Sequence, residues 1–185
     1  RHSVFANRLY LNASFGKQRL LNHLGGTENW LIPKYSTESV SITDQDFAFS
    51  QQVTEVRGHP LGARKGSSAA VLSTEIRIPF FQYILNQNWK NSFLRNLQLI
   101  GFTDIGFSWN GLIPNIKEAE EFKIRAQNPA VIVDVIYKRD PIISGMGIGL
   151  RSSLFGYFLR FDYAWPVDRF GFSKPLPHLS LGLDF

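Results

Sequence analysis

The last nine residues, 177–185 (PHLSLGLDF), alternate between apolar side chains and polar or small ones. One set comprises Leu179, Leu181, Leu183 and Phe185, and the other comprises His178, Ser180, Gly182 and Asp184. Because successive side chains of a strand point to opposite faces, this pattern predicts a strand with one apolar and one polar face.

The same period of two recurs in five segments upstream, at residues 5–15, 69–80, 97–109, 142–154 and 157–167. In the last of these, Leu159, Phe161, Tyr163 and Trp165 share a face, and Arg160 and Asp162 lie on the opposite one. The predicted strands are roughly 9–13 residues long, near or above the length that a tilted strand needs to cross a bilayer. Strands of soluble proteins average nearer to about 5–6 residues.

The polar faces of these strands carry charged side chains, which are Arg8, Glu75, Arg77, Asp104, Arg151, Arg160 and Asp162. In a membrane barrel such residues line the interior while the apolar faces contact lipid. A soluble β-sandwich or a lipocalin-like barrel is the alternative, with the apolar faces forming a core. We expect an all-β fold, a transmembrane antiparallel β-barrel.

Six strands are too few for a single-chain membrane barrel, since the smallest has about eight. An open sheet in lipid would leave unpaired edges at high cost. Residues 1–185 are therefore expected to be the C-terminal portion of one larger barrel domain whose N-terminal part is missing. The alternative is a barrel that closes by joining other chains. Long loops are expected at about 20–65 and 110–139, and shorter connections at 152–156 and 168–175.

The composition excludes several functions. The 185 residues include no Cys, so no disulfide framework, zinc knuckle or thiol nucleophile is available. The four His lack metal-ligand spacing, no Gly-x-Ser-x-Gly motif occurs, and the glycines at 145, 147 and 149 lack the spacing of a nucleotide-binding loop. The net charge is +5, but the basic residues are scattered along the chain, which argues against nucleic-acid binding. We expect no enzyme activity, metal or cofactor.

Five motifs, in order, carry a family resemblance. Residues 55–59 (EVRGH) resemble a Val-Arg-Gly-Phe/Tyr motif, and 73–81 (STEIRIPFF) resemble a Glu-x-Arg-x-Pro strand. Residues 101–109 (GFTDIGFSW) resemble a Phe-x-Asp-x-Gly strand, and 145–166 resemble a penultimate hairpin. With the aromatic C-terminus, these motifs resemble BamA/TamA-type barrels of the outer-membrane protein 85 superfamily. His59 and the Tyr157-Phe158 pair depart from the family pattern, in which an aromatic residue and Pro-Leu are usual.

The resemblance implies a 16-stranded barrel and an inward-folded loop held by a latch. In this chain the matching latch residues are Arg57, with Asp104 and Glu75 as its acidic partners, and two glycines, Gly58 and Gly106. These glycines permit close backbone approach, although a strand glycine also marks a bend. The last strand would serve as assembly signal and as one side of a weakly zipped seam, through Leu179, Leu181, Gly182, Leu183 and Phe185.

The resemblance further implies a place in the bacterial outer membrane and a role in inserting, assembling or translocating proteins there. The implied partners are outer-membrane lipid, lipopolysaccharide and other outer-membrane or periplasmic proteins. Alternatives are an anchoring accessory subunit of a larger complex, or a passive channel. Residues 24–33 and 46–50 are similar to a subset in which a propeller resembling the periplasmic protein TolB precedes the barrel.

Overall fold

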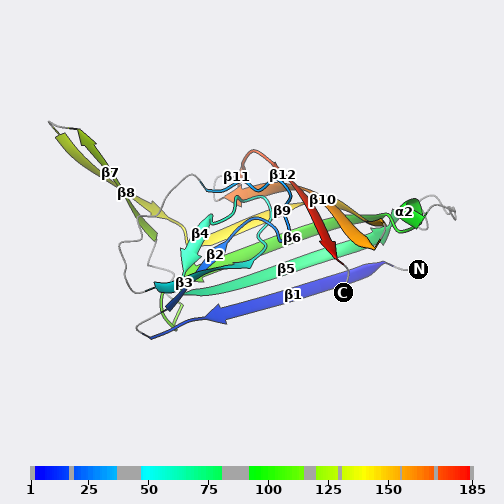
Figure 1. Cartoon of the computed structure of the whole chain (residues 1–185), viewed down its shortest axis with the longest axis horizontal. Coiled ribbons are helices and arrows are strands. Elements are labelled where there is room, and N and C mark those ends of the chain that lie inside the picture. The colour runs from blue at the N-terminus through cyan, green and yellow to red at the C-terminus, as the bar shows by residue number, and fades with distance from the viewer. Residues whose placement is uncertain are drawn as a thin grey trace.

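The computed structural model describes residues 3–16, 19–36, 47–80, 92–114, 120–128, 131–154, 156–168 and 171–183. Most of these residues belong to β-strands, and the longest strands form one curved antiparallel sheet (Figure 1). The expected all-β, antiparallel character is thus confirmed. Among the described residues the sheet is open, with β1 (Val4–Ala13) and β12 (Leu176–Leu183) at opposite edges.

The strands follow the order β1–β5–β6–β9–β10, and β12 pairs with β10. The interior strands are β5 (Ser68–Pro79), β6 (Gln98–Trp109), β9 (Ile142–Leu154) and β10 (Tyr157–Asp168). All six predicted strands are present with shifts of at most a few residues at their ends, whereas the two-residue β11 (Gly171–Phe172) was not predicted.

The two faces of the sheet have opposite polarity. One face, here the covered face, carries Glu75, Asp104 and Asp162, which are all buried and all lie against Arg57 of the loop between β1 and β5. The other, here the open face, carries the apolar side chains of the same strands, such as Ile148 at 56% and Phe161 at 42% exposure. Further exposed members are Phe5, Leu9, Leu11, Leu72, Ile76, Ile105, Met146, Leu150, Tyr163 and Leu181. The alternation in the sequence is therefore confirmed, with the charged set inside.

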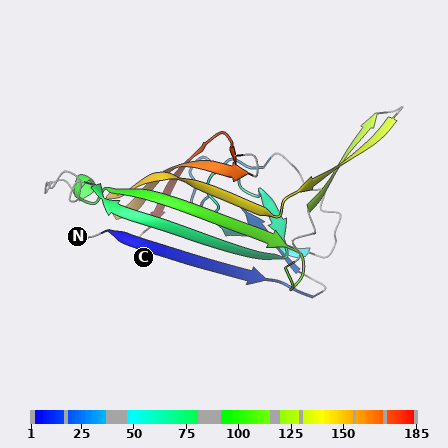
Figure 2. The same ribbon diagram turned by 180° about the vertical axis from the view of Figure 1, so that it is seen from behind.

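The long loop between β1 and β5 is more ordered than its sequence suggested. It contains a small sheet in which β2 (Arg19–Leu24) pairs in parallel with β3 (Phe47–Thr54) and antiparallel with β4 (Arg64–Gly66). In the view of Figure 2 the small sheet lies behind the large one. These short strands were not predicted, because they pair with each other and lack the sustained alternation of a two-faced sheet.

The second long connection contains a hairpin of β7 (Glu120–Asn128) and β8 (Val131–Arg139), which projects from one end of the sheet (Figure 1). At the other end is a single helical turn, α2 (Ser92–Arg95), where Ser152 donates a hydrogen bond to the carbonyl of Phe93. In the described part of the chain, no helix combines the length and apolar character needed to span a membrane.

Two small apolar clusters lie on the covered face in the described part of the chain. One joins Leu24, Val56 and Ala63 of the loop to Ala69, Val71 and Ile143 of the sheet. The other consists of Ile100, Phe102 and Ala164, which all belong to the sheet. The polar contacts between the loop and the covered face include those of Arg57.

Candidate functional site

A tight turn brings Arg57 onto the covered face. Val56 is packed in the first apolar cluster, and Gly58 has a φ of 91°, a left-handed conformation that favours glycine. A Cβ at Gly58 would also lie 2.9 Å from the backbone nitrogen of Pro166. The Gly58 amide donates to Nε2 of His178 on β12 over 3.0 Å. The turn is therefore fixed on both sides of Arg57.

The guanidinium of Arg57 makes a bidentate contact with Asp104. Nε donates to Oδ2 over 2.6 Å and Nη2 donates to Oδ1 over 2.8 Å, while the Arg57 amide also donates to Oδ2 over 3.2 Å. Both side chains are excluded from solvent, at 1% and 0% exposure. Two parallel charge-assisted bonds fix the orientation of the guanidinium as well as its position.

Arg57 also contacts other groups of the covered face. Its Nη1 donates to Oε1 of Glu75 over 2.8 Å and lies 3.5 Å from Oδ2 of Asp162. Its Cζ is 3.6 Å from the ring centroid of Phe102, close enough for a cation–π interaction. Arg57 thus links residues of β5, β6 and β10.

A second ion-pair network holds the residue two positions before Arg57. Glu55 lies 2.9 Å from Arg160 of β10 and 3.5 Å from Arg8 of β1. Arg160 also donates to Asp162 over 2.7 Å, so both networks share that carboxylate. Arg8 and Arg160 lie on strands near opposite edges of the sheet. Glu55 therefore connects the loop to strands on both sides of the sheet.

The buried charges of the loop are mutually compensated. Burial alone would lower the pKa of Arg57, but its hydrogen bond to Asp104 and the charges of Asp104 and Asp162 raise that pKa above its ordinary value. Burial alone would raise the pKa of Glu55, but Arg160, Arg57 and Arg8 hold that pKa below its ordinary value. Both side chains stay ionised at neutral pH.

The contacts nominated from the sequence are present. Arg57 reaches both expected carboxylates, Asp104 and Glu75, and Gly58 forms the turn. Gly106 lies under the loop, because a Cβ there would be 2.8 Å from Cγ2 of Val56. The contacts are confirmed, and their action as a latch stays a prediction.

Several partners of Arg57 and its turn were missed in the sequence. Alternation places Asp162, Phe102 and His178 on the covered face, but it does not reveal which strands lie side by side or in which register. The pairs Asp162–Gly149 and Asp104–Gly145 supply that register. The glycines of β9, which lies between β6 and β10, could have indicated where the Arg57 turn packs, because they leave room for it.

Gly145 provides a direct test of this close approach. A Cβ at this position would collide with the carbonyl oxygen of Arg57. We expect Gly145→Ala to displace the turn and increase protease cleavage within residues 14–67 at least several-fold. Gly101→Ala on β6 is the matched control, because its Cβ would meet nothing within 4 Å. Equal cleavage of the Gly145→Ala and Gly101→Ala proteins would contradict the placement of the turn.

His59 is expected to make the docking of the loop sensitive to pH. Its Nε2 donates to the Ser144 carbonyl over 2.8 Å, and burial, aided by Arg64, lowers its pKa below the ordinary 6.5. The undocked loop therefore binds more protons than the docked loop below about pH 6.5, and docking weakens as pH falls, by at most about 1.4 kcal/mol per pH unit.

We expect a nitroxide at position 35, exposed and paired through the backbone with Leu61, to become more mobile between pH 7.5 and 5.5. His59→Gln keeps a donor for Ser144 and removes the titration, so its spectrum should change less. Identical pH responses of the wild type and His59→Gln would show that His59 does not control docking.

The residues expected to form the seam lie on β12. Leu179 and Leu181 are on its open face, and Gly182 pairs with Phe158. The backbone of Leu183 pairs with Tyr157 at the end of the strand. Phe185 lies outside the described residues, so its expected role as an assembly signal stays a prediction.

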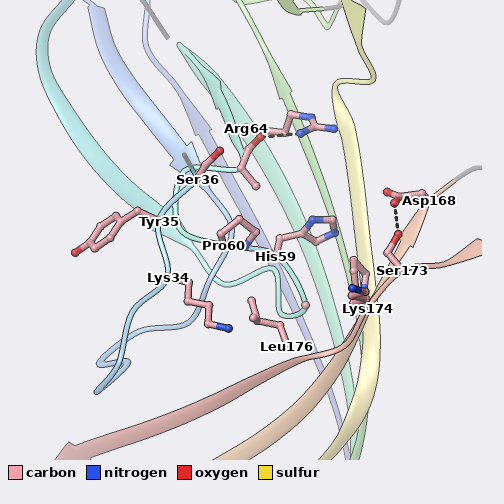
Figure 3. Close-up of a pocket in the computed structure, with 13 residues that line it drawn as sticks. Lys34, Tyr35, Ser36, His59, Pro60, Arg64, Asp168, Ser173, Lys174 and Leu176 are labelled. Atoms are coloured by element: carbon pink, nitrogen blue, oxygen red, sulfur yellow. Dashed lines mark hydrogen bonds between the residues drawn. The ribbon is translucent and has the colours of Figure 1, made fainter. Parts of the chain in front are cut away.

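A cavity of about 680 Å³ lies between the loop and the connection from β10 to β12 (Figure 3). Lys34, Tyr35 and His59 line it from the loop, and Asp168 and Lys174 from the connection. Ser173 donates to Asp168 over 2.9 Å at its rim. Within the described ranges, no group of three His, Asp or Glu side chains that could hold a metal ion occurs here or elsewhere.

Comparisons of the chain with protein-family models, with curated proteins and with solved structures find no match. The geometry of the sheet and of Arg57, together with the motifs in the sequence, therefore carries the functional inference.

Proposed function

We propose that this chain forms the C-terminal sheet of a 16-stranded β-barrel of the BamA/TamA type in the bacterial outer membrane. The observation that carries the proposal is the inverted polarity of the sheet. Apolar side chains are exposed along the open face, whereas Asp104, Asp162 and Glu75 are buried on the covered face. Exposing so large an apolar face to water would be unfavourable for a soluble protein, whereas contact with lipid chains is favourable for such a face.

The dimensions of the strands support the same placement. Strands β5, β6 and β10 have 12 residues each and β9 has 13. A tilted strand needs about 9–11 residues to cross the hydrocarbon layer. In this proposal the outer-membrane lipid, including lipopolysaccharide, contacts the open face, and the covered face lines the barrel interior.

The loop geometry supports the family assignment. Residues 55–59 resemble the loop motif of that family except at His59, and Arg57 contacts Asp104 and Glu75, which lie in two further motifs. In the proposed function the Arg57 turn is a latch that keeps the loop inside the barrel. The protein then inserts, assembles or translocates other outer-membrane proteins, and no catalytic chemistry or cofactor is involved.

Reconstitution tests this function. The full-length protein in liposomes should accelerate insertion of an unfolded client barrel, measured as protease-protected client, relative to empty liposomes. Arg57→Ala should reduce the acceleration while leaving the barrel itself inserted. An inserted protein without any effect on the client would favour the anchor, and stable ion conductance across a planar bilayer would favour the passive channel.

A further inference from the structure

The edge of β12 that faces away from β10 is partly occupied by the loop. In a strand, the N–H and C=O of one residue point to the same side, and successive residues alternate. The bonds of Leu179 and Leu181 to the loop place the backbone groups of odd-numbered residues on this outer edge. Pro177, which has no N–H, shares that alternation and is suited to an edge.

Residues 27–31 of the loop, here the strap, form a short antiparallel pairing with this edge. The Leu31 amide donates to the Leu179 carbonyl over 2.8 Å, and the Leu181 amide donates to the Asn29 carbonyl over 3.3 Å. Trp30 and Ser180 form the bridge between these bonds. On its opposite edge β12 pairs with β10, which is its only other strand partner in the described part of the chain.

Side chains reinforce the strap. Thr27 and Ser180 share a hydrogen bond of 2.9 Å between their hydroxyl groups. Trp30 is buried, with its ring centroid 4.3 Å from that of His178. The strap is therefore docked specifically on β12, through both backbone and side-chain contacts.

The strap is also connected to the Arg57 turn. The Glu28 amide donates to Oε1 of Glu55 over 3.1 Å, and the Gly26 amide donates to the His59 carbonyl over 3.0 Å. His178 contacts both units, because its ring packs at a tilt against Trp30 and its Nε2 accepts a hydrogen bond from the Gly58 amide. Movement of the Arg57 turn would thus disturb the strap.

We propose that the strap is an internal competitor for the outer edge of β12, the edge at the seam of the proposed barrel, and that it occupies the positions at which an extended strand of another polypeptide pairs when the seam is open. An exposed edge recruits strands by backbone hydrogen bonding. The strap uses the centre of an eight-residue strand, so an incoming antiparallel strand gains the full edge only when the strap leaves. The preferred partner is an extended segment of alternating polarity, because β12 has one apolar and one polar face. This inference rests on the proposed function.

A disulfide lock tests the competition in the full-length protein. Leu31 and Leu179 are directly opposed, and such pairs have Cα atoms about 5.5 Å apart, within disulfide range. The chain has no native cysteine to interfere. The probe is a fluorescein-labelled peptide with the alternating sequence of residues 4–13, and a scrambled peptide is the control. Binding is measured by anisotropy in detergent micelles for oxidised and reduced Leu31→Cys/Leu179→Cys.

The reduced protein should bind the peptide at least about tenfold more tightly than the oxidised one, and Trp30→Ala should bind more tightly than the wild type. Failure of the disulfide to form, equal binding in both redox states, or no binding to the reduced and Trp30→Ala proteins would each overturn the proposal. Insertion of the same proteins into liposomes is measured in parallel. Proteins that insert but show no redox effect refute the strap alone, whereas failure of the wild type to insert refutes the proposed function.

Discussion

Replacing Arg57 by alanine is expected to release the loop from the sheet while leaving the long strands paired. The substitution leaves Asp104, at 0% exposure, and Glu75 without their central cation. Breaking a buried ion pair by removing one partner costs about 3–5 kcal/mol. The long strands pair through their backbones and do not depend on Arg57, so this loss falls on the docking of the loop.

Protease cleavage within residues 14–67 measures the release, and heat-modifiable gel migration reports whether the proposed barrel is intact. Arg57→Lys is the matched control: it keeps the charge but not the planar fork that bonds both oxygens of Asp104, so it should give intermediate cleavage. A loop as resistant in Arg57→Ala as in the wild type would show that Arg57 does not hold it.

The second large effect is expected at the centre of β9. Ile148 lies midway along that 13-residue strand on the open face. If this face contacts the middle of the bilayer, Ile148→Arg should destabilise the inserted protein by about 2–4 kcal/mol. On a surface in water, such a substitution usually changes stability by no more than about 0.5 kcal/mol.

Urea titration of the protein in liposomes measures this difference. Ile113→Arg is the control, since Ile113 is 79% exposed in the connection after β6 and outside every strand. The Ile113 variant should resemble the wild type. Equal midpoints for Ile148→Arg and Ile113→Arg would place the open face in water.

The strands could be predicted from the sequence because alternation is a local property. The segment around Asp162 sets Arg160 and Asp162 against Phe161 and Tyr163, and the structure preserves that division. Motif order supplied the contact between Arg57 and Asp104, which are 47 residues apart.

Contacts that depend on register and loop path could not be predicted. The bridge between Trp30 and Ser180 joins residues 150 positions apart. Ser180 lies in the alternating run 177–185 and Trp30 in the stretch 24–33, but neither pattern indicates that the two residues pair. The parallel pairing of β2 with β3 was missed for a related reason. Their positions follow from packing on the covered face, a tertiary property that a strand period does not encode.

The central claim is that the open face lies in lipid. A nitroxide scan along β10 tests it most directly, using single cysteines at residues 159–165 of the full-length protein in liposomes. Collision rates with oxygen, which concentrates in lipid, and with an aqueous nickel chelate are compared at each position. The account predicts oxygen maxima at Leu159, Phe161, Tyr163 and Trp165, and minima at Arg160, Asp162 and Ala164. High nickel collision rates at the odd-numbered positions, or low rates for both reagents there, would contradict it.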